Sequence, residues 1–293
     1  ILNIAVFRKE TLYQKMRALI IYLVISAVFI GCTPILSIDA STQNVYHFSD
    51  TDKNISLLDI SETFGTYDGS FVLYDNNLDS WKIYDLEEAT KRIPPESTYK
   101  IYDALLGLES GIITPEHSSM TWNGDAFPFP SWEADQDLNS AMQNSVNWYF
   151  QAIDSQLGIN RVQEFLNKIE YGNQTTSSNL DLYWSDFSLK ISPLEQVTLL
   201  KKFNTNEFHL NFQNVFSVKN AIKIASTPNG NFYGKTGTGR VNGQDVNGWF
   251  IGYIETADNT YFFATNIGAD SNATGSNATE ITMSILSDMN IWK

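Results

Sequence analysis

Ser97 and Lys100 are the residues whose types and spacing most directly suggest chemistry. A spacing of three places both side chains on one face of a helix, one turn apart. A neutral lysine in this position could take the serine proton, provided that burial lowers its pKa well below the usual value of about 10.4. The helix N-terminus would add backbone N–H groups suited to a developing oxyanion. The pair predicts nucleophilic chemistry, although such a pair also occurs by chance in chains of this length.

Two short motifs in the middle of the chain could assist such a nucleophile. Ser145-Val146-Asn147 falls inside a helix predicted from 140 to 157 and could supply a hydroxyl for proton relay and an amide. The alternative interpretation of this motif is an ordinary solvated helix face. Tyr171-Gly172-Asn173 is by default a plain turn.

A glycine-containing strand supplies groups that could bind an anion. Lys235-Thr236-Gly237-Thr238-Gly239 overlaps a strand predicted from 231 to 238. Lys235 offers a cation, Thr236 and Thr238 offer hydroxyls for a carboxylate, and Gly237 would let a ligand approach the backbone closely. A glycine-interrupted edge strand explains the same residues without any ligand.

The elements that must position these motifs are strands near both ends of the chain and helices between them. This order predicts a mixed α/β (α+β) fold, with an antiparallel sheet flanked by helices and a helical subregion, rather than alternating β-α units. The residue patterns predict strands at 69–74, 81–84, 231–238, 248–255 and 261–266, and helices from 97 to a stop at Gly111, at 140–157, at 192–202 and at 278–289.

Composition excludes several classes of protein. The chain has 293 residues, a net charge of −14, 43% hydrophobic residues and one cysteine. This composition supports a sizeable core and excludes a disulfide framework or a cysteine-based zinc site. His47, His117 and His209 lie far apart, so we expect no metal. The acidic balance argues against a nucleic-acid partner.

The N-terminal part of the chain predicts a membrane anchor. Residues 18–38 contain no charged side chain and are numerous enough for a transmembrane helix. Basic residues dominate 1–17, so this end is expected in the cytoplasm and residues 41–293 form the predicted extracellular domain. A secretory signal or a lipoprotein signal ending at Cys32 are the alternatives. Because the chain starts at Ile1, we expect 1–17 to be the juxtamembrane end of a truncated upstream region.

The four motifs occur in one order, and this joint pattern resembles the penicillin-recognising serine proteins over about residues 45–293. Within that group it is similar to class D (oxacillinase-type) β-lactamases and to the membrane-bound β-lactam sensor-transducers of Gram-positive bacteria. Further matching segments are Gly69-Ser70-Phe71-Val72-Leu73-Tyr74, Pro95-Glu96-Ser97-Thr98-Tyr99-Lys100, Tyr183-Trp184, Leu189-Lys190-Ile191-Ser192-Pro193-Leu194-Glu195-Gln196 and Gly248-Trp249-Phe250-Ile251-Gly252.

The resemblance implies a role for each motif residue. Ser97 would be the acylated nucleophile, Lys100 the base, and Ser145 the proton shuttle to the lactam nitrogen. The backbone N–H groups of Ser97 and Thr238 would form the oxyanion hole. No cofactor is expected; the resemblance allows only carboxylation of Lys100 by carbon dioxide. The residues implied in binding a β-lactam or holding Lys100 are Asn147, Trp184, Lys235, Thr236, Gly237 and Thr238.

Asn147 separates two interpretations of the resemblance. Class D enzymes typically carry valine there, which keeps the lysine pocket dry. An amide can bond the lysine amine and compete with its carbamate, which leaves a long-lived acyl-protein. We therefore favour a β-lactam sensor, joined through the membrane to an upstream cytoplasm-facing protease region, over a class D β-lactamase. A transpeptidase acting on cell-wall peptides is the third alternative.

One feature of class D enzymes is missing from the sequence. Many of these enzymes bind the drug carboxylate with an arginine near the last helix, and residues 270–293 contain none. Arg240 lies too near the Lys-Thr-Gly strand to be assigned that role. We therefore expect Thr236 and Thr238 to bind the drug carboxylate without such an arginine.

Overall fold

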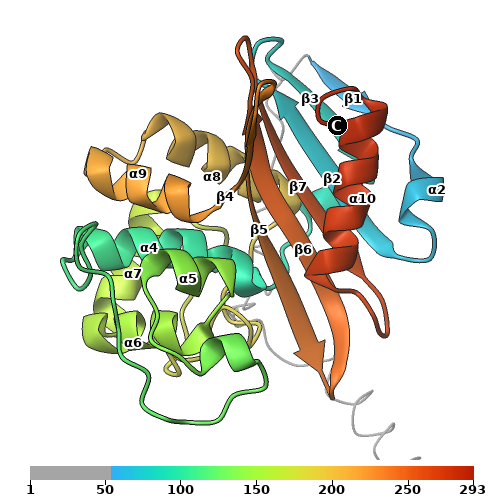
Figure 1. The fold of residues 1–293 in the computed structure, drawn as a ribbon. Coiled ribbons are helices and arrows are strands. Elements are labelled where there is room, and N and C mark those ends of the chain that lie inside the picture. The colour runs from blue at the N-terminus through green and yellow to red at the C-terminus, as the bar shows by residue number, and fades with distance from the viewer. Residues whose placement is uncertain (1–53) are drawn as a thin grey trace, which may run out of the picture. The chain divides into compact units, whose positions relative to one another are not determined.

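The computed structural model describes residues 54–293 (Figure 1). The predicted cytoplasmic end, at 1–17, and the predicted transmembrane helix, at 18–38, lie outside the described residues. Within 54–293, no helix is long and apolar enough to cross a membrane.

A seven-stranded sheet forms the centre of the fold. Its order is β1-β3-β2-β7-β6-β5-β4, and neighbouring strands are antiparallel except for the parallel pair β1 and β3. The predicted antiparallel sheet is thus confirmed apart from this edge. The strands are β1 (Ile55–Leu57), β2 (Asp68–Asp75), β3 (Ser80–Tyr84), β4 (Lys223–Thr227), β5 (Gly230–Val241), β6 (Gln244–Glu255) and β7 (Thr260–Gly268).

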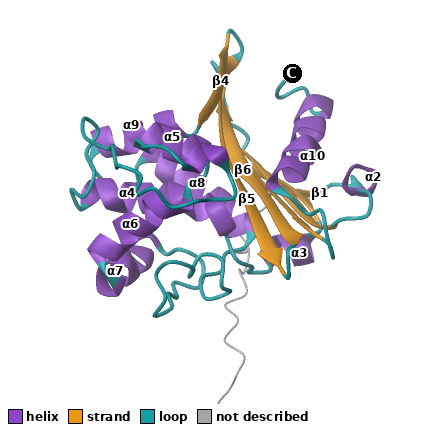
Figure 2. Ribbon diagram, turned by 60° about the horizontal axis from the view of Figure 1, so that its bottom comes forward, coloured by secondary structure: helices purple, strands orange, loops and turns teal. Residues whose placement is uncertain are grey.

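Helices cover both faces of this sheet (Figures 1 and 2). The C-terminal helix α10 and the short α2 lie on one face, and the larger helical block lies on the other. The helices are α2 (Ser61–Phe64), α3 (Leu86–Thr90), α4 (Lys100–Glu109), α5 (Leu138–Gln143), α6 (Asn147–Leu157), α7 (Ile159–Ile169), α8 (Pro193–Thr205), α9 (Phe212–Ala221) and α10 (Gly275–Asp288), with 3₁₀ turns η1 (Glu96–Tyr99) and η2 (Pro130–Trp132).

Strand β2 shows how the sheet separates two cores. Successive side chains on a strand point to opposite faces. Val72 and Tyr74 accordingly join the core beneath the helical block, whereas Phe71 and Leu73 join the core beneath α10. Burial on both faces explains why this strand is a nearly continuous apolar run.

The β5–β6 hairpin turns at Asn242 and Gly243, between the strands predicted at 231–238 and 248–255. Asn242 and Gly243 have φ values of 50° and 80° and connect Val241 to its partner Gln244. Two positive φ angles are what a tight two-residue hairpin requires, which favours Asn-Gly. The pairing shifts by one residue between Arg240 and Gly239, and the Lys-Thr-Gly residues pair with β6 beyond this irregularity.

The helix predicted from 140 to 157 is wrong in one respect, because the structure divides it into α5 and α6. Ser145 has a left-handed φ of 55°, and Val146 is extended. Asn144 donates its side-chain amide to the carbonyl of Ser140, a local bond that competes with helix continuation. Ser145 therefore lies between two helices instead of on a helix face.

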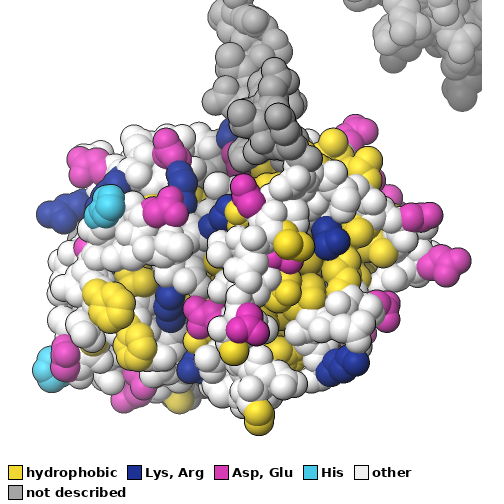
Figure 3. Space-filling model, turned by 90° about the horizontal axis from the view of Figure 1, so that it is seen from above, with side chains coloured by type: hydrophobic (Ala, Val, Ile, Leu, Met, Phe, Trp, Pro, Cys, Tyr) yellow, Lys and Arg dark blue, Asp and Glu magenta, His cyan; other side chains and the backbone are white. Residues whose placement is uncertain are grey.

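Charges on the described surface are mixed. On the face seen in Figure 3, acidic and basic side chains are interspersed and form no large patch of one sign. Apolar side chains also reach this surface in places. Among exposed apolar residues, Phe212 and Phe216 of α9 stack with ring centroids 6.4 Å apart.

Candidate active site

Ser97 and Lys100 meet at the junction of η1 and α4. Nζ of Lys100 lies 2.7 Å from Oγ of Ser97. The spacing of three residues therefore brings the two groups together as expected from a helical turn, although the first turn is 3₁₀ and the α-helix begins at Lys100. Ser97 lines an open cavity of about 500 Å³. A nucleophile and a candidate base are thus both in place.

Burial makes Lys100 suitable as a base. Its side chain is 1% exposed. Burial, assisted by the charge of Lys235, lowers the pKa of Lys100 well below its ordinary value, against smaller opposing effects of Asp103 and Glu96. A neutral amine has a lone pair that can accept the Ser97 proton.

Asn147 holds the other side of the lysine amine. As the first residue of α6, it places Oδ1 2.7 Å from Nζ of Lys100. The rings of Phe150 and Trp184 flank the same nitrogen, with centroids 5.6 and 5.7 Å away. Lys100 therefore lies between a hydroxyl, an amide oxygen and two aromatic walls.

Lys235 and Ser145 form a second polar pair. Nζ of Lys235 donates to Oγ of Ser145 over 3.0 Å and to the carbonyl of Thr236 over 3.0 Å. Burial lowers the pKa of Lys235 to about 7. The left-handed conformation of Ser145 directs its hydroxyl at Nζ of Lys235. Strained residues of this kind concentrate at functional sites.

Strand β5 presents its edge to the cavity. Its pairing with β4 reaches only Tyr233, so the stretch from Lys235 onward pairs with β6 alone. Thr236, Gly237 and Thr238 line the cavity with Ser97. Oγ1 of Thr238 accepts the backbone N–H of Gly275 at 2.9 Å, which leaves its own proton for a ligand.

The glycine of the Lys-Thr-Gly motif has a packing role that the sequence did not predict. A Cβ built on Gly237 would lie 3.0 Å from Cβ of Glu96 and 3.3 Å from the backbone nitrogen of Ser97. The backbone that approaches this glycine is the turn carrying the nucleophile. Gly237 lets β5 close on that turn and brings Thr236 and Thr238 to Ser97.

Trp184 packs near Lys100 and also supports the nucleophile's turn. Its ring stacks on Tyr99 at a centroid distance of 6.2 Å, and its carbonyl accepts the backbone N–H of Glu96 at 3.0 Å. The resemblance implied that Trp184 helps to hold Lys100, and in the structure its ring packs beside Nζ of Lys100 with the centroid 5.7 Å away.

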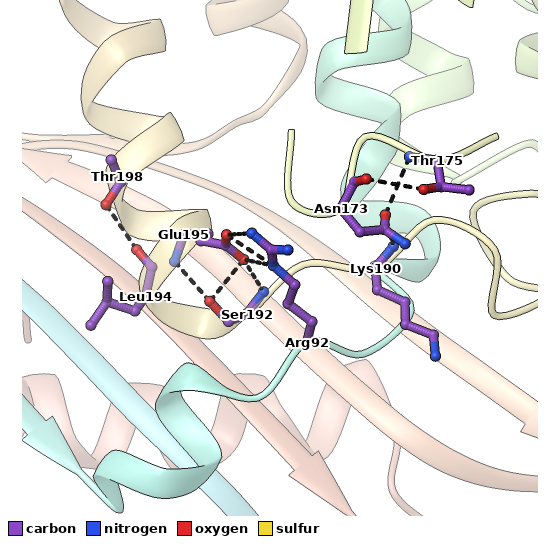
Figure 4. Close-up of polar contacts among 8 residues, drawn as sticks. All are labelled: Arg92, Asn173, Thr175, Lys190, Ser192, Leu194, Glu195 and Thr198. Atoms are coloured by element: carbon purple, nitrogen blue, oxygen red, sulfur yellow. Dashed lines mark hydrogen bonds and ion pairs between the residues drawn. The ribbon is translucent and has the colours of Figure 1, made fainter. Parts of the chain in front are cut away.

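The Tyr171-Gly172-Asn173 motif is a structural turn outside the cavity. Asn173 accepts the backbone N–H of Lys190 at 2.9 Å (Figure 4). It also donates to the carbonyl of Ser188 at 2.7 Å. Gly172 has a positive φ of 49°, and a Cβ there would overlap the carbonyl of Lys190. The motif thus fixes the segment that leads to α8.

An ion pair holds the segment before the nucleophile against α8. Nε of Arg92 lies 3.0 Å from both carboxylate oxygens of Glu195, which also closes the capping box with Ser192 (Figure 4). The adjacent residues Ile93 and Ile191 form a β-bridge. The chain entering η1 is therefore anchored on two sides.

The motif analysis missed several residues of the cavity. An aromatic and proline-rich segment contributes Phe129, Ser131 and Trp132, and its composition was the available signal. Arg240 also lines the cavity, although sequence reasoning did not assign it there, and it pairs with Asp245 at 2.8 Å. Within residues 54–293, no cluster of three His, Cys, Asp or Glu side chains could hold a metal ion.

Comparison with known proteins agrees with this geometry. The family model described as "Penicillin binding protein transpeptidase domain" matches residues 66–287. The chain belongs to this family. Within the family it is similar to the regulatory protein BlaR1 of Bacillus licheniformis, with 45% identity over 283 residues that cover 96% of this chain and 46% of the relative. The chain thus spans about half the length of that relative.

Solved structures of the family show the same fold. The C-terminal domain of the Bacillus licheniformis BlaR penicillin-receptor matches with a TM-score of 0.80 and 47% identity, covering 82% of this chain and 98% of that one. The class D β-lactamase BAT-2 matches with a TM-score of 0.76 and 35% identity, covering 80% and 97%. The resemblance to both groups that the motifs predicted is confirmed.

Proposed function

We propose that this chain is a β-lactam sensor whose penicillin-binding domain is acylated at Ser97, releases the acyl group slowly, and signals across the membrane to induce resistance. The observation that carries this proposal is the contact of Asn147 with Nζ of Lys100 at 2.7 Å. Similarity to a penicillin-receptor domain supports it.

Acylation uses the groups around Ser97. Neutral Lys100 takes the proton of Ser97 while Oγ attacks the lactam carbonyl, and backbone N–H groups of Ser97 and Thr238 stabilise the oxyanion. The lactam C–N bond then breaks. The proton reaches the lactam nitrogen through Ser145, which lies 3.0 Å from Lys235. The product is an ester on Ser97 and a ring-opened amine.

The carboxylate of the drug is bound on the β5 side of the cavity. Thr236 and Thr238 line the cavity and supply hydroxyls, and the buried Lys235 supplies a cation behind Ser145, which also lines it. Arg240 adds an exposed guanidinium on the same wall. In this proposal these groups take the place of the arginine that is missing from the last helix, although Arg240 is already paired with Asp245 on the same wall.

Slow release follows from the surroundings of Lys100. Deacylation requires a base that activates water, and a carboxylated lysine would be such a base. Its new carboxylate would have to displace Oδ1 of Asn147, because the rings of Phe150 and Trp184 close the neighbouring sides. Asn147 thereby favours the free amine, and the ester persists.

A class D β-lactamase is the second candidate. The similarity to BAT-2 and the packing of Trp184 beside Lys100 favour it. Such an enzyme would hydrolyse β-lactams through the same ester, with Lys100 carboxylated by carbon dioxide. The polar side chain of Asn147 in the lysine pocket favours the sensor.

The topology of the whole protein is part of the proposal. Residues 18–38 would cross the membrane, 1–17 would lie in the cytoplasm, and 41–293 would lie outside the cell. A cytoplasm-facing protease region would precede residue 1 in the whole protein. The chain covers 46% of BlaR1, which leaves length for such a region in the relative.

A turnover assay tests this function. Mixed with an excess of a chromogenic cephalosporin, the protein should release about one equivalent of product per chain in a burst. The sensor then shows almost no further hydrolysis. Continued linear hydrolysis after the burst would favour the β-lactamase, and the absence of any burst would contradict both candidates.

A further inference from the structure

Glu96, the residue before the nucleophile, is held in an unusual conformation. Its φ is +52° and its side chain is 5% exposed. The left-handed region is sterically unfavourable for a residue with a side chain. Such a residue persists where surrounding contacts over-determine it, and these sites are commonly functional.

Contacts on both the backbone and the side chain hold Glu96. Its N–H donates to the carbonyl of Trp184 at 3.0 Å. Its Oε1 accepts from Nδ2 of Asn247 at 3.2 Å, and the same amide donates to the carbonyl of Pro94 at 3.1 Å. Asn266 in turn donates to Asn247 at 2.8 Å, so that β7 and β6 both support the carboxyl.

The Lys-Thr-Gly strand is shaped around the same side chain. A Cβ on Gly237 would lie 3.0 Å from Cβ of Glu96, and a Cβ on Gly239 would overlap Oε1. The second glycine of Lys-Thr-Gly-Thr-Gly is thereby explained, because only a residue without a side chain leaves room for the carboxyl. Glu96, in the turn that carries Ser97, thus contacts both β5 and the backbone of Trp184.

Among residues 54–293, no cationic side chain forms an ion pair with the carboxyl of Glu96. Burial raises the pKa of Glu96 to about 8, while the hydrogen bond from Asn247 and the charge of Lys100 act in the opposite direction. Its side chain faces a second cavity of about 650 Å³, whose charged lining residues are Asp68, Glu88, Lys91, Arg240 and Asp270.

We propose that Glu96 is a positioning residue whose carboxyl must be protonated for Ser97 to be acylated at full rate. This inference rests on the proposed acylation. An ionised Glu96 would place an uncompensated negative charge one residue from the Ser97 N–H group. That charge would oppose the oxyanion that this group stabilises. The protonated carboxyl keeps the packing on Gly237 and Gly239 without the charge.

Glu96 acts on the chemical step, whereas Lys235 acts on binding. The two effects separate in the saturation kinetics of acylation, because loss of the Lys235 cation weakens the initial complex. Ionisation of Glu96 lowers the first-order rate constant at saturating β-lactam. A change in packing alone would not depend on pH.

The test measures the saturated rate constant of acylation by a penicillin from pH 6 to pH 9.5, using the full chain. In the wild-type protein this constant should fall above about pH 8, approaching tenfold per pH unit. Glu96→Gln keeps the shape of the side chain and should hold the constant level within about twofold over that range. The control Glu88→Gln alters another carboxyl on the same cavity and should behave as the wild type.

Two outcomes would overturn the inference. If Glu96→Gln shows the same alkaline fall as the wild type, Glu96 does not control the step, although acylation itself stands. If the wild type is not acylated at any pH, the proposed function fails and this inference fails with it.

A second measurement, made on the wild-type protein, tests the inference if Glu96→Gln does not fold. Infrared spectra of wild-type protein labelled with ¹³C-glutamate should show a protonated glutamate carboxyl at pH 7 that disappears by about pH 9.5. Labelling glutamate alone separates this band from the buried aspartates. Absence of the band at pH 7 would overturn the inference without any variant.

Discussion

The side-chain oxygen of Asn147 lies 2.7 Å from Nζ of Lys100, the same distance that separates this nitrogen from Oγ of Ser97. Asn147 comes from α6 and Ser97 from η1, so the amine joins two elements that are far apart in sequence. In the proposed mechanism, the contact with Ser97 serves acylation and the contact with Asn147 disfavours the carboxylated base needed for release.

Replacing the nucleophile should abolish covalent labelling. Ser97→Ala removes the only hydroxyl that contacts Lys100 among the described hydrogen bonds. Labelling by a fluorescent penicillin should fall to background, while circular dichroism stays unchanged because Ser97 is only half-buried. Ser110→Ala, at the other end of α4, is the control and should be labelled as the wild type. Residual labelling of Ser97→Ala would point to another nucleophile.

Replacing Asn147 should speed release of the acyl group. Asn147→Val removes the amide oxygen from Nζ of Lys100 and leaves a dry pocket that can accept a carbamate. We expect the deacylation rate constant to rise at least about tenfold, or 1.4 kcal/mol in barrier, and to rise further with added bicarbonate. Asn160→Val, at an exposed position of α7, should release as slowly as the wild type. Equal release rates in Asn147→Val and the wild type would contradict the role of Asn147.

Binding of the drug carboxylate should weaken as pH rises through 7. Burial lowers the pKa of Lys235 to about 7, so its cation is present below this pH and lost above it. The apparent dissociation constant of the complex before acylation should rise up to about tenfold between pH 6 and pH 8. Lys235→Gln should bind weakly at all pH values. A pH-dependent constant in that variant would assign the effect to another group.

A buried acid should make the fold less stable at alkaline pH. Burial raises the pKa of Asp154, which interacts with the buried Asp103, above the value of the unfolded chain. The neutral form is favoured in the folded state, so its contribution is present below the pKa of the unfolded chain and is lost as pH rises through the folded-state pKa.

Urea unfolding of Asp154→Asn between pH 5 and pH 9 measures this contribution. The variant should lose less stability than the wild type over this range, and the control Asp288→Asn, at an exposed site, should follow the wild type. Parallel stability curves for Asp154→Asn and the wild type would show that Asp154 does not titrate in this way.

Local patterns in the sequence were sufficient to predict the contact of Ser97 with Lys100, and they account for the tight turn of the β5–β6 hairpin. The three-residue spacing of Ser97 and Lys100 depends on one helical turn, and Asn242-Gly243 meets the positive φ angles of its turn by itself. The capping box of α8 is equally local, because Ser192 and Glu195 bond each other's backbone.

Features that depend on distant contacts could not be predicted in the same way. The helix break at Ser145 places this residue against Lys235, ninety positions later. The presence of Arg240 in the cavity follows from the β5–β6 pairing. The role of Gly239 is visible only once the carboxyl of Glu96 lies across it.

Intact mass spectrometry of the chain mixed with a small excess of a penicillin, followed over hours, tests the central claim most directly. We predict a mass increase of one drug molecule, located on Ser97, that persists throughout. Rapid return to the free mass with hydrolysed penicillin in solution would contradict the sensor and identify a class D β-lactamase.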